Sequence, residues 1–225
     1  MKCSLGVVSI KAFLSKDIKC DERLDILKKD LDLSFIPVLE RRRLSQSSKI
    51  AFGLLKSVES MPIIFSSHKG EINRCFAMMK DLAVHHITSP TAFSLSVLNS
   101  TPALLAIASK NHSEILAVSA RDSLECGLIN AYILLRDSKD KVALVISYDE
   151  SQSDKSRDIS VVSAFVSLDT ALPQIVLHKS LRQKSEIPSN IAFLKAFSQN
   201  SSQYQNGDFT LQIGDLLKGF SLADF

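Results

Sequence analysis

The sequence lacks most signatures of metal-binding, secreted and membrane proteins. Its four cysteines form no CxxC pair and show no Cys/His ligand spacing, which argues against a zinc module or a disulfide framework. Free thiols in a reducing cytoplasm are the simpler interpretation. No run approaches the ~18 apolar residues of a membrane span, and the first residues lack the long apolar core and A-x-A site of a signal peptide. We therefore predict a cytoplasmic protein, and nothing implies a metal or another cofactor.

Charge and nucleotide-binding motifs are also sparse. The net charge is only +3 over 225 residues, and basic residues are interleaved with acidic ones, which does not indicate a nucleic-acid partner. The GxxxxGK[ST] phosphate loop and the G-x-S-x-G nucleophile elbow are both absent. With 45% hydrophobic and 23% charged residues, the chain has the composition of a globular protein. Its length suits one domain or a tight pair with a full core.

Residues 89–150 carry the clearest order of elements. A Ser-Pro-Thr turn precedes an apolar run, and then follow a helix, a strand, an apolar helix and a strand, at residues 92–98, 99–110, 114–119, 123–136 and 141–148. A strand, a crossover helix and a strand in this order predict a βαβ unit with parallel neighbours in a buried sheet.

The flanking segments extend this α/β pattern. We expect strands at residues 5–14, 62–66 and 159–168, an irregular stretch with a short helix at 15–39, and helices at 37–59 and 71–84. Together they predict a mixed, mainly parallel sheet of about five strands with helices on both faces, formed by residues 1–168. Residues 169–225 show a strand, a helix and a strand, and we expect them to form a small C-terminal cap on this domain.

Two segments, Arg-Arg-Arg-Leu-Ser at residues 41–45 and Ser-Pro-Thr-Ala-Phe-Ser-Leu-Ser-Val-Leu-Asn at residues 89–99, resemble the β-ketoacyl synthase-like, N-terminal domain family, which has a thiolase-like fold. The resemblance covers about residues 37–168. It is closest to short members that pair with a catalytic ketosynthase and act like chain-length factors, as in aryl polyene biosynthesis. It implies that this chain is one thiolase-like half.

The resemblance also places the family's nucleophile. In the family a cysteine follows a small residue directly after the strand that corresponds to residues 114–119. Here Ala120 is followed by Arg121, and Cys126 lies five positions further along, inside the predicted helix. A reactive thiolate is favoured at a helix N-terminus, so we interpret Cys126 as a small core residue rather than a nucleophile. The second half of a complete ketosynthase, which supplies the catalytic histidines, has no room in this chain.

The same resemblance predicts a partner surface. In ketosynthases the segment matching residues 92–98 lies at the dimer interface, beside the acyl tunnel of the opposite subunit. It implies that the interface and tunnel wall are formed by Phe93, Leu95, Val97, Leu98, Thr101, Leu116 and Val118. In the family the strand at residues 114–119 pairs with its twin in the partner. A short apolar edge strand left open is an aggregation risk, and this predicts an obligate dimer.

Three cationic or buried features have more than one interpretation. The residues Arg41, Arg42 and Arg43 suit an acidic carrier protein or its phosphopantetheine phosphate, but a solvated helix end is the preferred reading. Arg121 at a helix N-terminus is electrostatically unfavourable unless it pairs with Asp122, Glu125 or a partner's carboxylate. The helix at 123–136 is apolar nearly all round, so the tail or a partner must cover it.

We therefore predict a non-catalytic, chain-length-factor-like subunit. It would form a heterodimer with a full-length β-ketoacyl-[acyl-carrier-protein] synthase in polyene or fatty-acid-type biosynthesis, with the acyl carrier protein as the further partner. One alternative is an acyltransferase or thioesterase that uses Ser119 or Ser123 with a nearby histidine. Another is a homodimeric thiolase-like protein with a structural role.

Overall fold

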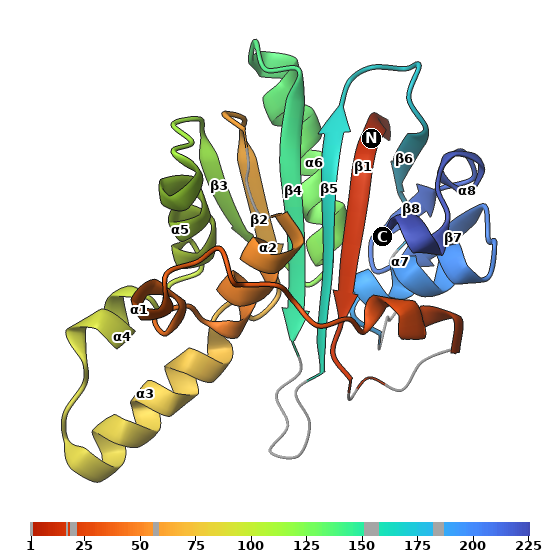
Figure 1. Ribbon diagram of the computed structural model, residues 1–225. Helices are drawn as coiled ribbons and strands as arrows, with labels where there is room; N and C mark the ends of the chain where they lie inside the picture. Colours follow the sequence, from red (N-terminus) through yellow and green to blue (C-terminus); the bar gives the residue numbers. More distant parts are fainter. Residues whose placement is uncertain (1, 17, 19–21, 56–58, 151–157, 182–186) are drawn as a thin grey trace.

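One eight-stranded sheet forms the centre of the molecule (Figure 1). The computed structural model describes residues 2–16, 18, 22–55, 59–150, 158–181 and 187–225. The strands are β1 (Lys2–Leu14), β2 (Ile63–Ser67), β3 (Ile115–Ser119), β4 (Val142–Glu150), β5 (Ile159–Ser167), β6 (Gln174–Lys179), β7 (Gln203–Asn206) and β8 (Phe209–Gln212). Their order across the sheet is β3-β2-β4-β5-β1-β6-β8-β7.

Helices lie on both faces of this sheet, as predicted. They are α1 (Val38–Arg41), α2 (Gln46–Leu55), α3 (Ile72–His85), α4 (Pro90–Ser94), α5 (Ser100–Ser109), α6 (Ser123–Asp137), α7 (Ser189–Ser198) and α8 (Leu216–Gly219), with short 3₁₀ turns η1 (Glu22–Leu27) and η2 (Leu222–Asp224). Strands β2 and β4 contribute to a hydrophobic cluster on each face, as alternating side chains require. Ile64 and Val145 pack toward α6, whereas Ile63 and Leu144 pack toward α2 and α5.

The sheet is mixed, but the prediction that it is mainly parallel was wrong. Among the described strands, β2 alone pairs in parallel, with β3 and with β4, and the other five pairings are antiparallel. A parallel connection needs a crossover of about a dozen residues or more. Helix α6 provides one between β3 and β4, but residues 151–158 are too few to do so between β4 and β5.

The five-strand count was also wrong for the whole chain. Strands β1 to β5 do come from residues 1–168, but β6, β8 and β7 continue the same sheet beyond β1. Residues Lys2 to Gly6 pair with β6 along the edge of β1 that faces away from β5. The C-terminal residues extend the sheet because this edge of β1 is open to pairing, and in addition they place α7 beside α6.

The helix predicted at residues 37–59 is interrupted. Helix α1 ends at Arg41, and α2 begins at Gln46. The Oγ atom of Ser45 accepts a hydrogen bond from the amide of Ser48 (3.1 Å), which satisfies one of the unpaired amides at the start of α2. Residues 56–58, at the predicted end of this helix, lie outside the described residues.

Helix α6 lies very close to the sheet. A Cβ atom at Gly127 would lie 2.6 Å from the Oγ atom of Ser66 and 3.0 Å from Cγ1 of Val145, so only glycine fits at this crossing. On the outward side of α6, Ile129 is half-buried and the side chain of Ile133 is 51% exposed. Helix α7 therefore covers α6 on one side, and part of its apolar surface remains uncovered within this chain.

Candidate functional site

The resemblance predicts the nucleophile position at the corner where β3 ends and α6 begins. Arg121 occupies it and is exposed to solvent, whereas Asp122 and Ser123 next to it are buried. The carboxyl ends of the parallel strands β2, β3 and β4 meet here, the edge at which α/β folds usually place their sites. The corner thus presents the guanidinium group of Arg121 to solvent.

Cys126 lies five positions after Arg121, inside α6. Its side chain is half-buried, and burial raises the pKa of the thiol to about 11, helped by the negative charges of Asp122 and Glu125. The thiol is therefore protonated at neutral pH, while thiolate is the nucleophilic form. That Cys126 is a core residue rather than a nucleophile stays a prediction.

Ser123 is held inside a polar network. Its Oγ atom donates to Oδ2 of Asp149 (2.7 Å) and accepts from Oγ of Ser147 (3.0 Å), and the residue is completely buried. Burial raises the pKa of Asp149, although the hydrogen bond from Ser123 and the nearby charge of His68 act in the opposite direction. His68 itself is exposed on the turn after β2. A serine with no exposed surface cannot reach a thioester.

Glu125 connects the corner to the C-terminal residues. It is completely buried, and its carboxylate accepts hydrogen bonds from Ser189, from Tyr204 (3.4 Å) and from Asn206 (3.3 Å). Burial raises its pKa to about 7, partly opposed by the hydrogen bonds from Ser189 and Asn206. The suggested pairing of Arg121 with Glu125 is therefore wrong, because the carboxylate faces the protein interior.

Asp122 is also turned inward. It is 8% exposed, and its Oδ2 atom accepts from the backbone amide of Asp208 (3.4 Å). Sequence reasoning missed these contacts with the C-terminal residues. The available signal was an acidic side chain within an otherwise apolar helix, since a buried carboxylate needs hydrogen-bond donors from elsewhere in the fold.

The residues predicted to face a partner do not all lie on the surface. Phe93, in α4, is 64% exposed, and Val97, which follows the end of α4, is 47% exposed. Leu95, between them, is half-buried. Leu98 is half-buried against the hydrophobic cluster below α2 and α5. Thr101 is completely buried and donates to Glu71 (3.0 Å), so its side chain takes no part in this surface.

Strand β3 forms one end of the sheet, as expected for an edge strand. It pairs only with β2 among the described strands. Leu116 and Val118 are half-buried against the hydrophobic cluster on the α6 face, and Ile115 is 36% exposed. Figure 1 shows β3, α4 and α5 on the same side of the molecule. The predicted tunnel-wall segment and the open strand edge thus share one side.

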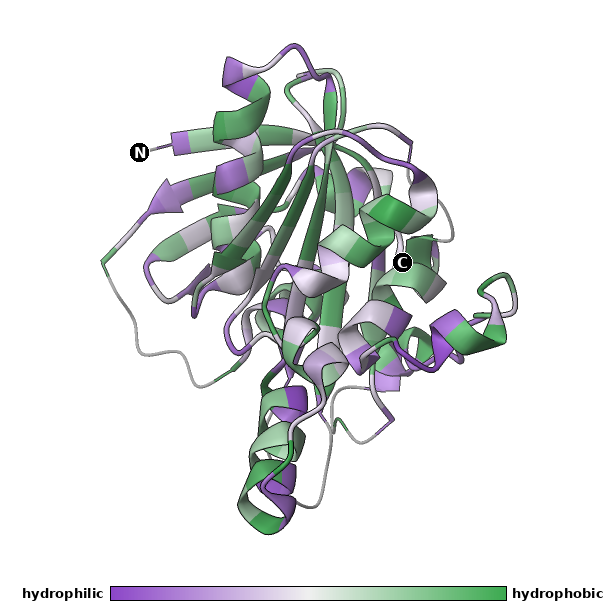
Figure 2. Cartoon of the chain, turned by 90° about the vertical axis from the view of Figure 1, so that its left-hand side faces the viewer, coloured by the Kyte–Doolittle hydropathy of each residue, from purple (hydrophilic) through white to green (hydrophobic). Residues whose placement is uncertain are grey.

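Helix α3 projects away from the body on the same side of the molecule as β3, α4 and α5 (Figure 1). No residue of α3 is buried. In Figure 2 hydrophobic and hydrophilic residues both appear along this projecting helix. Phe76, Met79 and Leu82 are 41%, 58% and 51% exposed. We use the name arm for α3 and α4 together. Large apolar side chains on a projecting helix are typical of a surface that contacts another protein.

A buried carboxylate that the sequence did not reveal fixes the base of the arm. Oε1 of Glu71 accepts from Ser45 (2.9 Å), Ser47 and Thr101, and Oε2 lies 3.6 Å from Nε of Arg74. The network joins the N-terminal ends of α2, α3 and α5, so it determines where the arm leaves the body.

The three consecutive arginines differ in exposure. Arg41 is half-buried and its Nη2 atom donates to the carbonyl of Ile36 (2.9 Å). Arg42 and Arg43 are exposed, and the carbonyl of Arg43 accepts from Nη2 of Arg74 (3.2 Å). Arg41 therefore has a structural contact, and only the other two present guanidinium groups fully to solvent.

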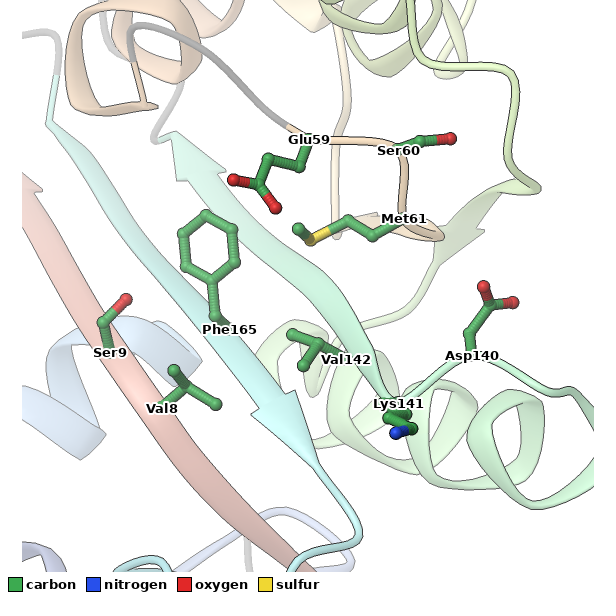
Figure 3. Close-up of a pocket in the computed structure, with 9 residues that line it drawn as sticks. All are labelled: Val8, Ser9, Glu59, Ser60, Met61, Asp140, Lys141, Val142 and Phe165. Atoms are coloured by element: carbon green, nitrogen blue, oxygen red, sulfur yellow. The ribbon is translucent and has the colours of Figure 1, made fainter.

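A cavity of about 540 Å³ lies at the opposite end of the sheet, where β2 and β4 begin. Figure 3 shows the residues that line it. Val8, Met61, Val142 and Phe165 form its apolar lining, and Glu59, Asp140 and Lys141 bring charges of both signs. None of the residues predicted to act in catalysis or in partner binding lines this cavity. It is therefore separate from the corner at Arg121.

The described residues hold neither a cluster of metal-ligating side chains nor a membrane-spanning helix. Among them, no group of three or more His, Cys, Asp or Glu side chains is arranged to hold a metal ion. Within the same residues, no helix is both long enough and apolar enough to cross a membrane.

A family model described as the β-ketoacyl synthase, N-terminal domain, matches residues 19–207. The chain belongs to this family. No curated protein matches its sequence. The β-ketoacyl synthase-like assignment made from residues 41–45 and 89–99 is thereby confirmed.

Solved structures share the thiolase-like ketosynthase fold. A ketosynthase in complex with its chain length factor from Xenorhabdus doucetiae contains a chain with a TM-score of 0.75 and 19% identity, covering 93% of this chain and 98% of that one. The ishigamide ketosynthase/chain length factor has a TM-score of 0.59 and 10% identity, and the match covers 80% of this chain and 68% of that one. A complex of a type II polyketide synthase acyl-carrier protein with its ketosynthase contains a chain with a TM-score of 0.57 and 8% identity. The match covers 89% of this chain and 74% of that one.

Proposed function

We propose that this β-ketoacyl synthase-like chain is a non-catalytic subunit that pairs with a full-length β-ketoacyl-[acyl-carrier-protein] synthase in the cytoplasm and completes its acyl tunnel. The observation that carries the proposal is the side of the molecule that combines the open edge of β3 with the exposed residues Phe93 and Val97. An open strand edge pairs readily with a second chain, and exposed apolar side chains beside it enlarge the buried area.

The corner at α6 supports a role without chemistry. Arg121 stands in the nucleophile position, the Cys126 thiol is protonated at neutral pH, and Ser123 is inaccessible. The partner would supply the cysteine and histidines for condensation. In the alternative of a Ser/His hydrolase, Ser123 could not act as the nucleophile because it is inaccessible. Of the two candidate serines, Ser119 at the end of β3 is exposed.

The similar structures support this choice of partner. The Xenorhabdus doucetiae complex contains a ketosynthase with its chain length factor, and this chain covers 98% of the matched subunit. We propose the same kind of pairing here, in polyene or fatty-acid-type biosynthesis. For the acyl carrier protein we propose a contact with Arg42 and Arg43, because both are exposed.

The test of the non-catalytic role is a condensation assay with the co-purified complex, malonyl-loaded carrier protein and an acyl primer. Arg121→Ala, Cys126→Ala and Ser119→Ala are made in this chain, and the nucleophilic cysteine of the ketosynthase is replaced as a control. We expect the three variants to retain activity within about twofold and the partner's variant to lose it. A loss of more than a hundredfold in any of the three variants, in an intact complex, would show that this chain contributes to the chemistry.

A further inference from the structure

A second cavity opens at the other end of the α2-covered face, away from both β3 and the cavity of Figure 3. Its volume is about 380 Å³, within the ~300–1,000 Å³ range of small-molecule sites. It is enclosed by the end of β1, the segment after η1, the first half of α2 and the start of β5. These elements come together in the lower part of Figure 1.

The floor of this cavity is apolar. Phe13 and Ile159 line it and are 9% and 2% exposed. Both belong to the hydrophobic cluster beneath α2, and Leu31 and Leu33, which also line the cavity, pack against that cluster. A hydrocarbon chain placed here would therefore contact the existing core on one side.

The rim, in contrast, is strongly basic. Among the described residues of its lining, four are lysines, Lys16, Lys28, Lys29 and Lys49, and one is a carboxylate, Asp30. Lys16 pairs with Asp30 at 3.3 Å, but both side chains are more than 70% exposed, and such surface pairs contribute little. Lys28 pairs with a carboxylate outside the cavity lining, Asp25, at 2.7 Å.

Lys29 is held by a main-chain contact. Its Nζ atom donates to the main-chain oxygen of Phe225, the last residue of the sequence (2.9 Å), which fixes the side chain in place. Partial burial lowers its pKa, and the charge of Lys11 lowers it further. An ammonium group that is disfavoured by desolvation and by a neighbouring cation gains from a bound negative charge.

From this geometry we propose that the cavity binds an acidic amphiphile, a hydrocarbon chain that ends in a carboxylate or a phosphate monoester. The acidic head would lie among Lys16, Lys29 and Lys49, and the chain would lie on Phe13 and Ile159. A free fatty acid and a phosphate-monoester lipid share this chemistry. The site is separate from the partner surface, so it does not depend on the proposed pairing.

The test is isothermal titration calorimetry of the full-length chain, or of its complex, below the critical micelle concentration. The probes are dodecanoate, dodecyl phosphate, dodecanol and inorganic phosphate. We expect saturable one-to-one binding of at least one of the two charged amphiphiles, and binding at least tenfold weaker for dodecanol and for inorganic phosphate. Tighter binding of dodecanoate would assign a fatty acid, and tighter binding of dodecyl phosphate would assign the phosphate monoester.

The variant Lys16→Gln/Lys49→Gln removes two rim charges and leaves the bond from Lys29 to Phe225 intact. We expect it to weaken binding of the charged probes at least tenfold, with an unchanged melting temperature. The matched control, Lys139→Gln/Lys179→Gln, removes two exposed lysines that do not line the cavity and should bind as the unmodified chain does. Equal weakening by both variants, equal binding of dodecanol, or no saturable binding of either charged probe would overturn the proposal.

Discussion

The amide of Ile63, where β2 begins, donates a hydrogen bond to the carbonyl of Glu114, just before β3 (2.9 Å). At the other end of these two strands, the amide of Ala120 donates to the carbonyl of Ser67 (3.1 Å). Backbone polar groups of alternate residues in a strand point to the same side. The even-numbered residues of β3 therefore bond to β2, and Ile115, Ala117 and Ser119 direct their N–H and C=O groups to the open edge.

This alternation makes Ala117→Pro a selective test of the edge. Proline removes the amide that would pair with a partner strand, yet no bond to β2 is lost, and proline is tolerated on strand edges of this kind. We expect the variant to lose at least 90% of the complex in a co-purification assay while the remaining chain melts within a few degrees of the unmodified chain.

Ala117→Val provides the matched control, because it keeps the amide and has high strand propensity. It should assemble normally. If Ala117→Pro assembles as well as Ala117→Val does, β3 is not the strand that pairs with the partner.

The arm gives a second prediction about the same surface. Phe93→Glu and Val97→Glu place a charge at residues that are 64% and 47% exposed, so they should leave the fold intact but weaken the complex at least tenfold. Size-exclusion chromatography with light scattering gives the assembled fraction. Leu181→Glu, at a residue that is 92% exposed outside the arm and β3, is the control and should have no effect.

A third prediction concerns the tunnel wall. Val97→Trp should shift the product to shorter chains, because a larger side chain at the far end of the tunnel leaves less room for the growing acyl group. The measurement is mass spectrometry of the carrier-bound products formed by intact complexes. An unchanged product distribution would place Val97 outside the tunnel, even if it lies in the interface.

The buried Glu125 gives a prediction of pH dependence. Its pKa is raised from 4.5 to about 7, so the folded state binds a proton more tightly than the unfolded state does. The free energy of unfolding should therefore fall as pH rises from 4.5 to about 7 and then level off. At about 1.4 kcal/mol for each tenfold change in proton affinity, the loss is of the order of 3 kcal/mol.

Urea denaturation between pH 4.5 and 8 measures this loss. Glu125→Gln should make the curve flatter, since the amide has no charged form, and Glu114→Gln, at an exposed residue, should leave the slope unchanged. The same slope in Glu125→Gln as in the unmodified chain would mean that the titration belongs to another group.

The C-terminal residues should unfold together with the rest of the sheet. Phe193 is completely buried, and its ring lies 6.3 Å from those of Phe197, Tyr204 and Phe225. We expect Phe193→Ala to reduce the free energy of unfolding by about 3–5 kcal/mol and to retain a single transition. Two separate transitions by fluorescence and circular dichroism would indicate that residues 169–225 form an independent unit.

Local sequence patterns predicted the central elements well. The strand, helix and strand at β3, α6 and β4 have strong hydrophobic patterns and adjacent turn residues, so their order followed from the sequence. The two strands are parallel, but they are not neighbours as predicted, because β2 lies between them and pairs with both. The position of β3 at the end of the sheet was also correct.

Features that depend on distant contacts were not predictable in this way. The break before α2 depends on the side chain of Ser45, which donates to the distant Glu71 and accepts from the amide of Ser48. The extra strands depend on an open edge of β1, far away in sequence, and the burial of Glu125 depends on Ser189 and Asn206. Each is decided by which groups need a hydrogen-bond partner once the sheet has formed, and hydrophobic periodicity carries no such information.

Native mass spectrometry tests the central claim most directly. The tagged chain is expressed alone and together with the ketosynthase encoded nearest to it, and the purified products are weighed. The account predicts a one-to-one complex with the ketosynthase and little stable protein when the chain is expressed alone. A stable homodimer that forms no complex with the ketosynthase would contradict it and would favour the structural homodimer instead.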